Sequence, residues 1–99
     1  MTLIVEVKFR RKGRTIRFEG EGTIVAIRTA LFAKRYFEEN KGANMLWVTL
    51  RSIDIPQWRR FIATLRLLGI KIRMRPPRGG QRAGIIVYRD GMVGDERER

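Results

Sequence analysis

Residues 70–90, IKIRMRPPRGGQRAGIIVYRD, decide how the C-terminal part of the chain folds. Apolar and basic side chains alternate through residues 70–75, and this period of two predicts a strand with one apolar and one basic face. Residues 84–89, GIIVYR, are dense in β-formers and predict a second strand. The connection between them, residues 76–83, is too long for a tight hairpin turn. We therefore expect a C-terminal β-hairpin that carries a basic arm.

The hairpin concentrates basic side chains between residues 71 and 89. Like charges along one strand face are mutually destabilising unless something neutralises them, and the planar guanidinium of arginine fits phosphates and base edges. A plain solvent-exposed connection, kept soluble by arginine, is the alternative interpretation of the loop. We expect the following side chains to contact nucleic acid: Lys71, Arg73, Arg75, Arg78, Arg82 and Arg89.

An N-terminal hairpin is predicted over residues 2–19. Residues 2–10 alternate apolar and polar side chains, and residues 15–19 repeat the pattern after a turn in which Gly13 can supply a positive φ. The turn is itself basic, so we expect it to form a second nucleic-acid contact surface, although short charged turns are also common without any ligand. Its basic side chains are Arg10, Arg11, Lys12 and Arg14.

Two helices are predicted between the hairpins. The first spans residues 24–39, with Thr23 as its N-cap and apolar side chains at helical spacing. The second begins after Asp54, an N-cap in capping-box register with Gln57, and has Pro56 in its first turn. The expected core positions of the two helices are Ile24, Ile27, Ala30, Leu31, Phe37, Trp58, Phe61, Ile62, Leu65 and Leu68.

The strand predicted at residues 45–51 is apolar on both faces, which favours a central place in the sheet. The order of elements is then ββαβαββ. Strand–helix–strand connections imply crossovers, so we expect an α+β fold, an α/β two-layer sandwich in which two helices pack on a mixed sheet. One domain is expected over residues 1–90, followed by a disordered tail at residues 91–99.

Charge is the most informative bulk property. The chain has 22 Lys and Arg against 10 Asp and Glu, a formal net charge of +12, and four of the acids fall in the last ten residues. A thermophile-like surface is also rich in bases, but it usually pairs them with Glu in ion-pair networks. We therefore expect nucleic acid, DNA or RNA, as the partner. An acidic protein or a membrane surface is the remaining kind of partner for so basic a chain.

Membrane insertion and secretion are not expected. No apolar run approaches the ~18 residues that a membrane span needs, and the N-terminus lacks the basic segment and cleavage site of a signal peptide. The absence of cysteine is compatible with a reducing compartment. We expect a cytoplasmic protein, associated with the nucleoid if it binds DNA.

Catalytic residue types are scarce. The chain has no histidine and a single serine, Ser52, so histidine bases, histidine–metal sites and a Ser–His nucleophile are excluded. Glu6-Val7-Lys8 matches half of a metal-dependent nuclease site, but no Asp on an upstream strand accompanies it to hold Mg²⁺. We expect no catalytic site, cofactor or metal. A Mg-dependent nuclease at Glu6 and Lys8 is one alternative, and a small protein-interaction subunit that binds an acidic partner is another.

The aromatic side chains divide by their sequence context. Trp47 and Trp58 lie in apolar periodic segments and are expected in the core or at a dimer contact. Tyr88 and Val87 fall on opposite faces of the last strand. An exposed Tyr88 beside Arg89 is therefore a candidate for stacking on a base.

From residue 15 onward, the predicted order strand–helix–strand–helix–strand–basic loop–strand resembles in topology the Alba family of small archaeal chromatin and RNA-binding proteins. It is also similar to the C-terminal domain of the third bacterial initiation factor. The N-terminal hairpin is additional, and Glu19-Gly20-Glu21-Gly22 stands where Alba proteins have a lysine pair. The resemblance implies a homodimer whose two arms reach into DNA minor grooves. Our leading prediction is a non-enzymatic, largely sequence-nonspecific nucleic-acid-binding protein, with DNA ahead of RNA as its ligand.

Overall fold

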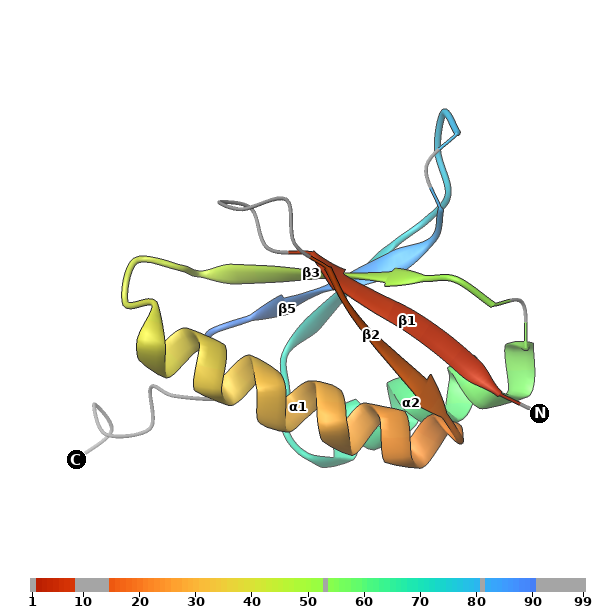
Figure 1. Cartoon of the computed structure of the whole chain (residues 1–99), viewed down its shortest axis with the longest axis horizontal. Coiled ribbons are helices and arrows are strands. Elements are labelled where there is room, and N and C mark those ends of the chain that lie inside the picture. The colour runs from red at the N-terminus through yellow and green to blue at the C-terminus, as the bar shows by residue number, and fades with distance from the viewer. Residues whose placement is uncertain (1, 9–14, 53, 81, 91–99) are drawn as a thin grey trace.

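The computed structural model describes residues 2–8, 15–52, 54–80 and 82–90 (Figure 1). The elements follow the predicted order ββαβαββ. They are β1 (Leu3–Lys8), β2 (Thr15–Gly20), α1 (Gly22–Glu39), β3 (Met45–Leu50), α2 (Ile55–Leu67), β4 (Ile72–Arg75) and β5 (Gly84–Tyr88). The predicted disordered tail at residues 91–99 lies outside the described residues.

The strands of the described residues form one five-stranded sheet in the order β2-β1-β3-β5-β4, with β3 in its centre as predicted. Every neighbouring pair is antiparallel, so the prediction of a mixed sheet is wrong. The helices do connect strands that run in the same direction. However, β1 lies between β2 and β3, and β5 lies between β3 and β4, so no two parallel strands are hydrogen-bonded neighbours.

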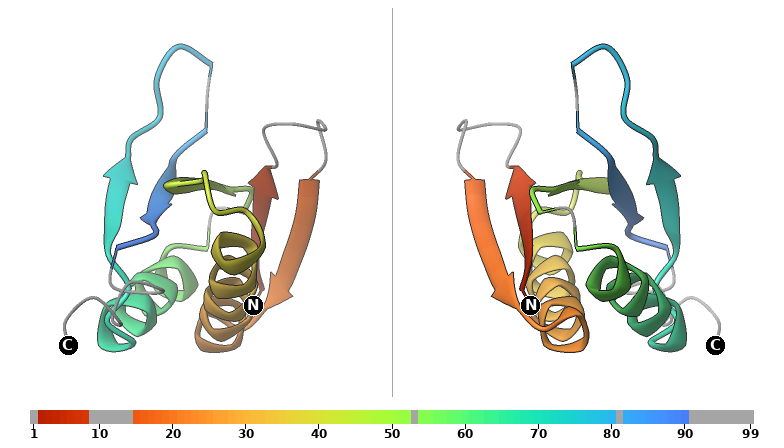
Figure 2. Two further views of the ribbon diagram at one scale, coloured as in Figure 1. Left: turned by 90° about the vertical axis from the view of Figure 1, so that its left-hand side faces the viewer. Right: turned by 90° about the vertical axis from the view of Figure 1, so that its right-hand side faces the viewer.

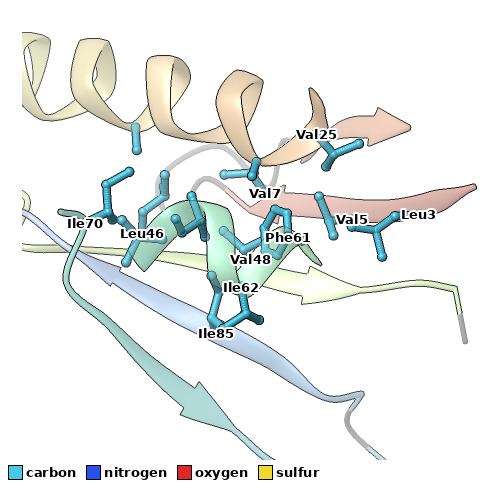
Figure 3. Packing of buried hydrophobic residues seen from close by; sticks show 14 of the residues in the cluster. Leu3, Val5, Val7, Val25, Leu46, Val48, Phe61, Ile62, Ile70 and Ile85 are labelled. Carbon is cyan, nitrogen blue, oxygen red and sulfur yellow. The ribbon is translucent and has the colours of Figure 1, made fainter. Parts of the chain in front are cut away.

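Both helices lie on the same side of the sheet, which makes the predicted two-layer sandwich (Figure 2). Alternate strand residues point into the layer between sheet and helices, among them Val5, Val48 and Ile85, all fully buried (Figure 3). Phe61 of α2 packs into the same cluster. Burial of each such side chain stabilises the fold by about 1.5–3 kcal/mol. The intervening strand residues face away from both helices, and we call this side of the sheet the helix-free face.

The start and the buried stripe of α1 differ from the prediction. The helix begins at Gly22, preceded by Glu21, rather than after an N-cap at Thr23. The backbone N–H of Gly22 donates to the Oε1 atom of Gln57 at 2.6 Å, and a Cβ at this position would collide with the Gln57 carbonyl oxygen. This close approach to α2 fixes the rotation of α1. Its buried residues are Gly22, Val25, Ala26, Thr29, Ala33 and Phe37.

That rotation exposes part of the stripe expected in the core. Ile24, Ile27 and Leu31 are 47%, 43% and 65% exposed. Phe37 is buried as predicted, and Ala30 is partly buried against the core. The other buried positions lie one or two residues away from predicted ones, so the period of the pattern was right but its phase over most of the helix was wrong. The phase depends on a contact between residues 35 positions apart, which the local pattern does not contain.

The second helix agrees with its prediction more closely. Asp54 accepts a hydrogen bond from the Gln57 backbone N–H at 3.1 Å, and a proline occupies the first turn. The buried side chains are Trp58, Phe61, Ile62 and Leu65. Leu68 was expected in the core but follows the helix and is exposed. Neither α1 nor α2 is long and apolar enough to cross a membrane.

Candidate nucleic-acid interface

Strand register places side chains in rows across the helix-free face. Trp47 of β3 is opposite Ile86 of β5, which is opposite Arg73 of β4. The neighbouring row consists of Arg17, Glu6, Thr49, Gly84 and Arg75. The basic side chains of β4 therefore lie on the side of the sheet that neither helix covers.

The edge strand β4 carries exposed positive charge on this face. Arg73 is exposed, and so is Lys71, which immediately precedes the strand. The Tyr88 N–H donates to the Lys71 carbonyl at 3.0 Å, so the pairing register continues to this residue. A purely structural role for the same residues is also known, because charged side chains on an edge strand hinder unwanted pairing with the sheet of another molecule.

The predicted arm extends from the ends of β4 and β5, away from both helices (Figure 2). At its tip Gly79 and Gly80 have φ values of 51° and 82°, in the left-handed region that glycine enters at little cost. Arg78 and Arg82 are exposed. At its base, the Leu50 N–H donates to the Ala83 carbonyl at 2.9 Å, which ties the arm to β3.

Arg75 lies across the sheet. Its Nη2 atom donates to Thr49 Oγ1 at 3.2 Å, and its Nη1 atom donates to the Arg82 carbonyl at 3.5 Å. Its guanidinium carbon lies 4.8 Å from the centroid of the Trp47 ring. The Arg75 side chain can reach from β4 over β5 to β3 because the β5 residue in this row, Gly84, has no side chain. The Nε atom is buried and has no hydrogen-bond partner among the described residues.

Arg89 binds backbone carbonyls of its own chain. Its Nε atom donates to the Ala43 carbonyl at 2.7 Å, and its Nη2 atom donates to the carbonyls of Phe37 and Asn40 at 2.8 and 2.7 Å. Its guanidinium also lies over the Phe37 ring, 5.3 Å from the centroid. A cation at the C-terminal end of α1 satisfies carbonyls that have no helical partner. We therefore assign Arg89 to the end of α1 and leave it out of the candidate interface.

Glu6 is the acid of the Glu-x-Lys motif. Its carboxylate lies 3.8 Å from Arg17 Nη2 and 3.6 Å from Arg51 Nε, so two guanidinium groups flank it on the helix-free face. The side chain of Lys8 lies outside those the structure describes. Within the described ranges, no group of three or more His, Cys, Asp or Glu side chains comes together that could hold a metal ion. No specific observation therefore favours the nuclease alternative.

The four basic residues of the first turn, Arg10, Arg11, Lys12 and Arg14, lie outside the described residues, so their part in the interface stays a prediction. Of the remaining predicted contacts, the structure groups Lys71, Arg73, Arg78 and Arg82 on the edge strand and arm.

Trp47 was expected in the core or at a dimer contact. It is on the helix-free face and 36% exposed, so its core placement is wrong and the dimer contact stays a prediction, whereas Trp58 is buried as expected. The signal was present in residues 45–50, MLWVTL, where the alternate residues Leu46 and Val48 already supply the apolar face that the core requires. Tyr88, proposed as a stacking residue, is half-buried on the same face.

No known protein family, curated protein or solved structure matches this chain.

Proposed function

We propose that the protein binds nucleic acid largely without sequence specificity, through the edge strand β4 and the arm. The observation that carries this proposal is the exposure of Lys71, Arg73, Arg78 and Arg82 along an edge that neither helix covers. A net charge of +12 adds long-range attraction toward a polyanion. In the cell such a protein would act in the cytoplasm, on the nucleoid if its ligand is DNA.

The binding chemistry is phosphate contact. Exposed guanidinium and ammonium groups neutralise backbone phosphates and release condensed counterions, which supplies affinity without sequence information. The arm extends beyond the ends of β4 and β5 (Figure 2), and its exposed Arg78 and Arg82 can follow a backbone that lies across the edge strand. The arginines of the first turn form a second contact surface in this proposal.

The test is a titration of duplex DNA and of RNA at several salt concentrations. The four contacts of β4 and the arm alone predict that log affinity falls against log salt with a slope of about −3.5 on duplex DNA, and contacts from the first turn make the slope steeper. A binding constant that does not respond to salt, or no binding at low salt, contradicts the proposal.

A second candidate function, protein interaction, is favoured by the apolar side chains that α1 leaves uncovered. Ile24, Ile27 and Leu31 follow one another at three- and four-residue spacing on its outer side. We propose a second copy of the chain as the occupant, because the stripe is self-complementary. In an antiparallel pairing, Ile24 of one copy meets Leu31 of the other, and Glu21 at one end meets Lys34 at the other. An acidic partner protein would be a different occupant of the same stripe.

A further inference from the structure

We propose that the Trp47–Arg75 pair on the helix-free face is a stacking site for an unpaired base, so that the preferred ligand is a single strand. This inference rests on the proposed nucleic-acid binding and adds the form of nucleic acid. Its chemistry is the exposed π-face of a base, which unpaired DNA and unpaired RNA both offer.

The first observation is the position of Trp47. It is on the central strand of the sheet, yet its indole points away from the core and is 36% exposed. The core side of β3 is already filled by Leu46 and Val48, both buried. Packing therefore does not require an indole here. An exposed aromatic ring on an open sheet surface is the kind of side chain on which unpaired bases stack.

The second observation is that Arg75 lies over one side of the indole. A hydrogen bond to Thr49 Oγ1 at 3.2 Å and a longer contact to the Arg82 carbonyl at 3.5 Å position its guanidinium, whose carbon lies 4.8 Å from the indole centroid. A Cβ at Gly84 would collide first with the Val48 carbonyl oxygen and would also lie 2.9 Å from the Arg75 Nη2 atom, so the glycine that the backbone requires here also leaves room for the guanidinium. A planar guanidinium stacks on bases as an aromatic ring does. The pair is therefore ordered before any ligand arrives.

The third observation is the surroundings of the pair. Ile86 lies next to Trp47 in its row, with the exposed Arg73 beyond it, and Tyr88 lies one row away, opposite Met45. Ile86 itself is buried, so the surface for bases consists of the exposed indole with the half-buried Tyr88 one row away, and it adjoins a basic edge for phosphates. A duplex presents its phosphates to such a surface but keeps the faces of its bases inside the stack. Only an unpaired strand uses both parts of the surface.

The experiment compares three ligands of one sequence: a DNA single strand, an RNA single strand and the DNA duplex. Trp58→Phe leaves Trp47 as the sole tryptophan, so indole fluorescence reports on the proposed site. We expect both single strands to quench this fluorescence strongly and the duplex to quench it weakly. Quenching by only one of the two single strands would show whether the site binds unpaired DNA or unpaired RNA.

A substitution series measures the contribution of the ring to affinity. Trp47→Leu is expected to lower the ratio of single-strand to duplex affinity by at least about fivefold, the lower range for one stacked base. Trp47→Phe, which keeps an aromatic ring, should restore most of that ratio. Because stacking releases no counterions, the salt slope on single strands should not change.

The outcomes separate this inference from the proposed function. If no ligand binds at low salt, the proposed function fails. If single strands and duplex bind equally and neither quenches Trp47, phosphate binding stands and the stacking site is overturned. The fluorescence measurement needs no change at Trp47, so it decides the question even if Trp47→Leu does not fold.

Discussion

The guanidinium of Arg89 donates to three backbone carbonyls around the end of α1, those of Phe37, Asn40 and Ala43. Each hydrogen bond to a charged group contributes about 1.5–3 kcal/mol when it is well sheltered, but two of these are only partly buried and the one to Asn40 is exposed. We expect Arg89→Ala to lower the free energy of unfolding by about 2 kcal/mol, which corresponds to a fall in Tm of roughly 10 °C. Thermal unfolding followed by circular dichroism measures this.

Arg89→Lys is the matched control, because it keeps the charge but cannot reach three carbonyls with a planar fork. It should recover part of the lost stability. Nucleic-acid affinity should change little in either variant. An unchanged Tm together with weakened binding would place Arg89 in the interface instead.

Gly22 supports the packing of α1 against α2. A Cβ there would meet the carbonyl of Gln57, a backbone atom that cannot move aside independently. We expect Gly22→Ala to destabilise the protein by about 1–3 kcal/mol, even though alanine is the better helix former by about 1 kcal/mol. Gly42→Ala is the control, because nothing lies within 4 Å of that position. Equal denaturant midpoints for the two variants would contradict this description of the helix contact.

At the scale of the element, the exposed stripe of α1 predicts self-association. Leu31→Glu places a charge in the middle of the proposed helix pair and should convert a dimer to a monomer, measured by light scattering on a sizing column. Leu67→Glu is the control, because Leu67 is 87% exposed on α2, away from the stripe. A wild-type protein that stays monomeric at high concentration would rule out the second copy as the occupant of the stripe.

The elements themselves could largely be predicted from the sequence, because local rules govern them. Alternation defined β1 and β4, and Asp54 with Gln57 defined the start of α2. The pairing of the strands could not be predicted in the same way. A helical crossover dictates that two strands run in the same direction, but it does not say whether a third strand enters between them.

The candidate site was predictable in its charges but not in their roles. The clustering of basic residues in the last hairpin predicted a basic arm, and Lys71, Arg73, Arg78 and Arg82 are exposed there, but the edge position of β4 was not predicted. Arg75 and Arg89 looked equivalent to their neighbours in the sequence, yet the first binds Thr49, 26 residues away, and the second binds Phe37, 52 residues away. Roles set by such distant partners become visible only in the folded chain.

For the whole molecule, the fold gives the two sides of the sheet different roles. One side of the sheet is covered by two helices that complete the core, and the other combines an exposed indole with a basic edge and arm. Basic side chains also lie on the helices, for example Arg59 and Arg66 of α2, both exposed. The central claim is that binding depends on where the charge lies as well as on its total.

The most direct test is the salt dependence of nucleic-acid binding in two double variants of equal charge. Arg78→Ala with Arg82→Ala removes two arm contacts, whereas Arg59→Ala with Arg66→Ala removes the same charge from α2. On duplex DNA the arm variant should bind more weakly than wild type, with a log–log slope shallower by about 2. The helix variant should keep the wild-type slope. Equal slopes for the two variants, or a larger loss from the helix variant, would contradict binding through the arm.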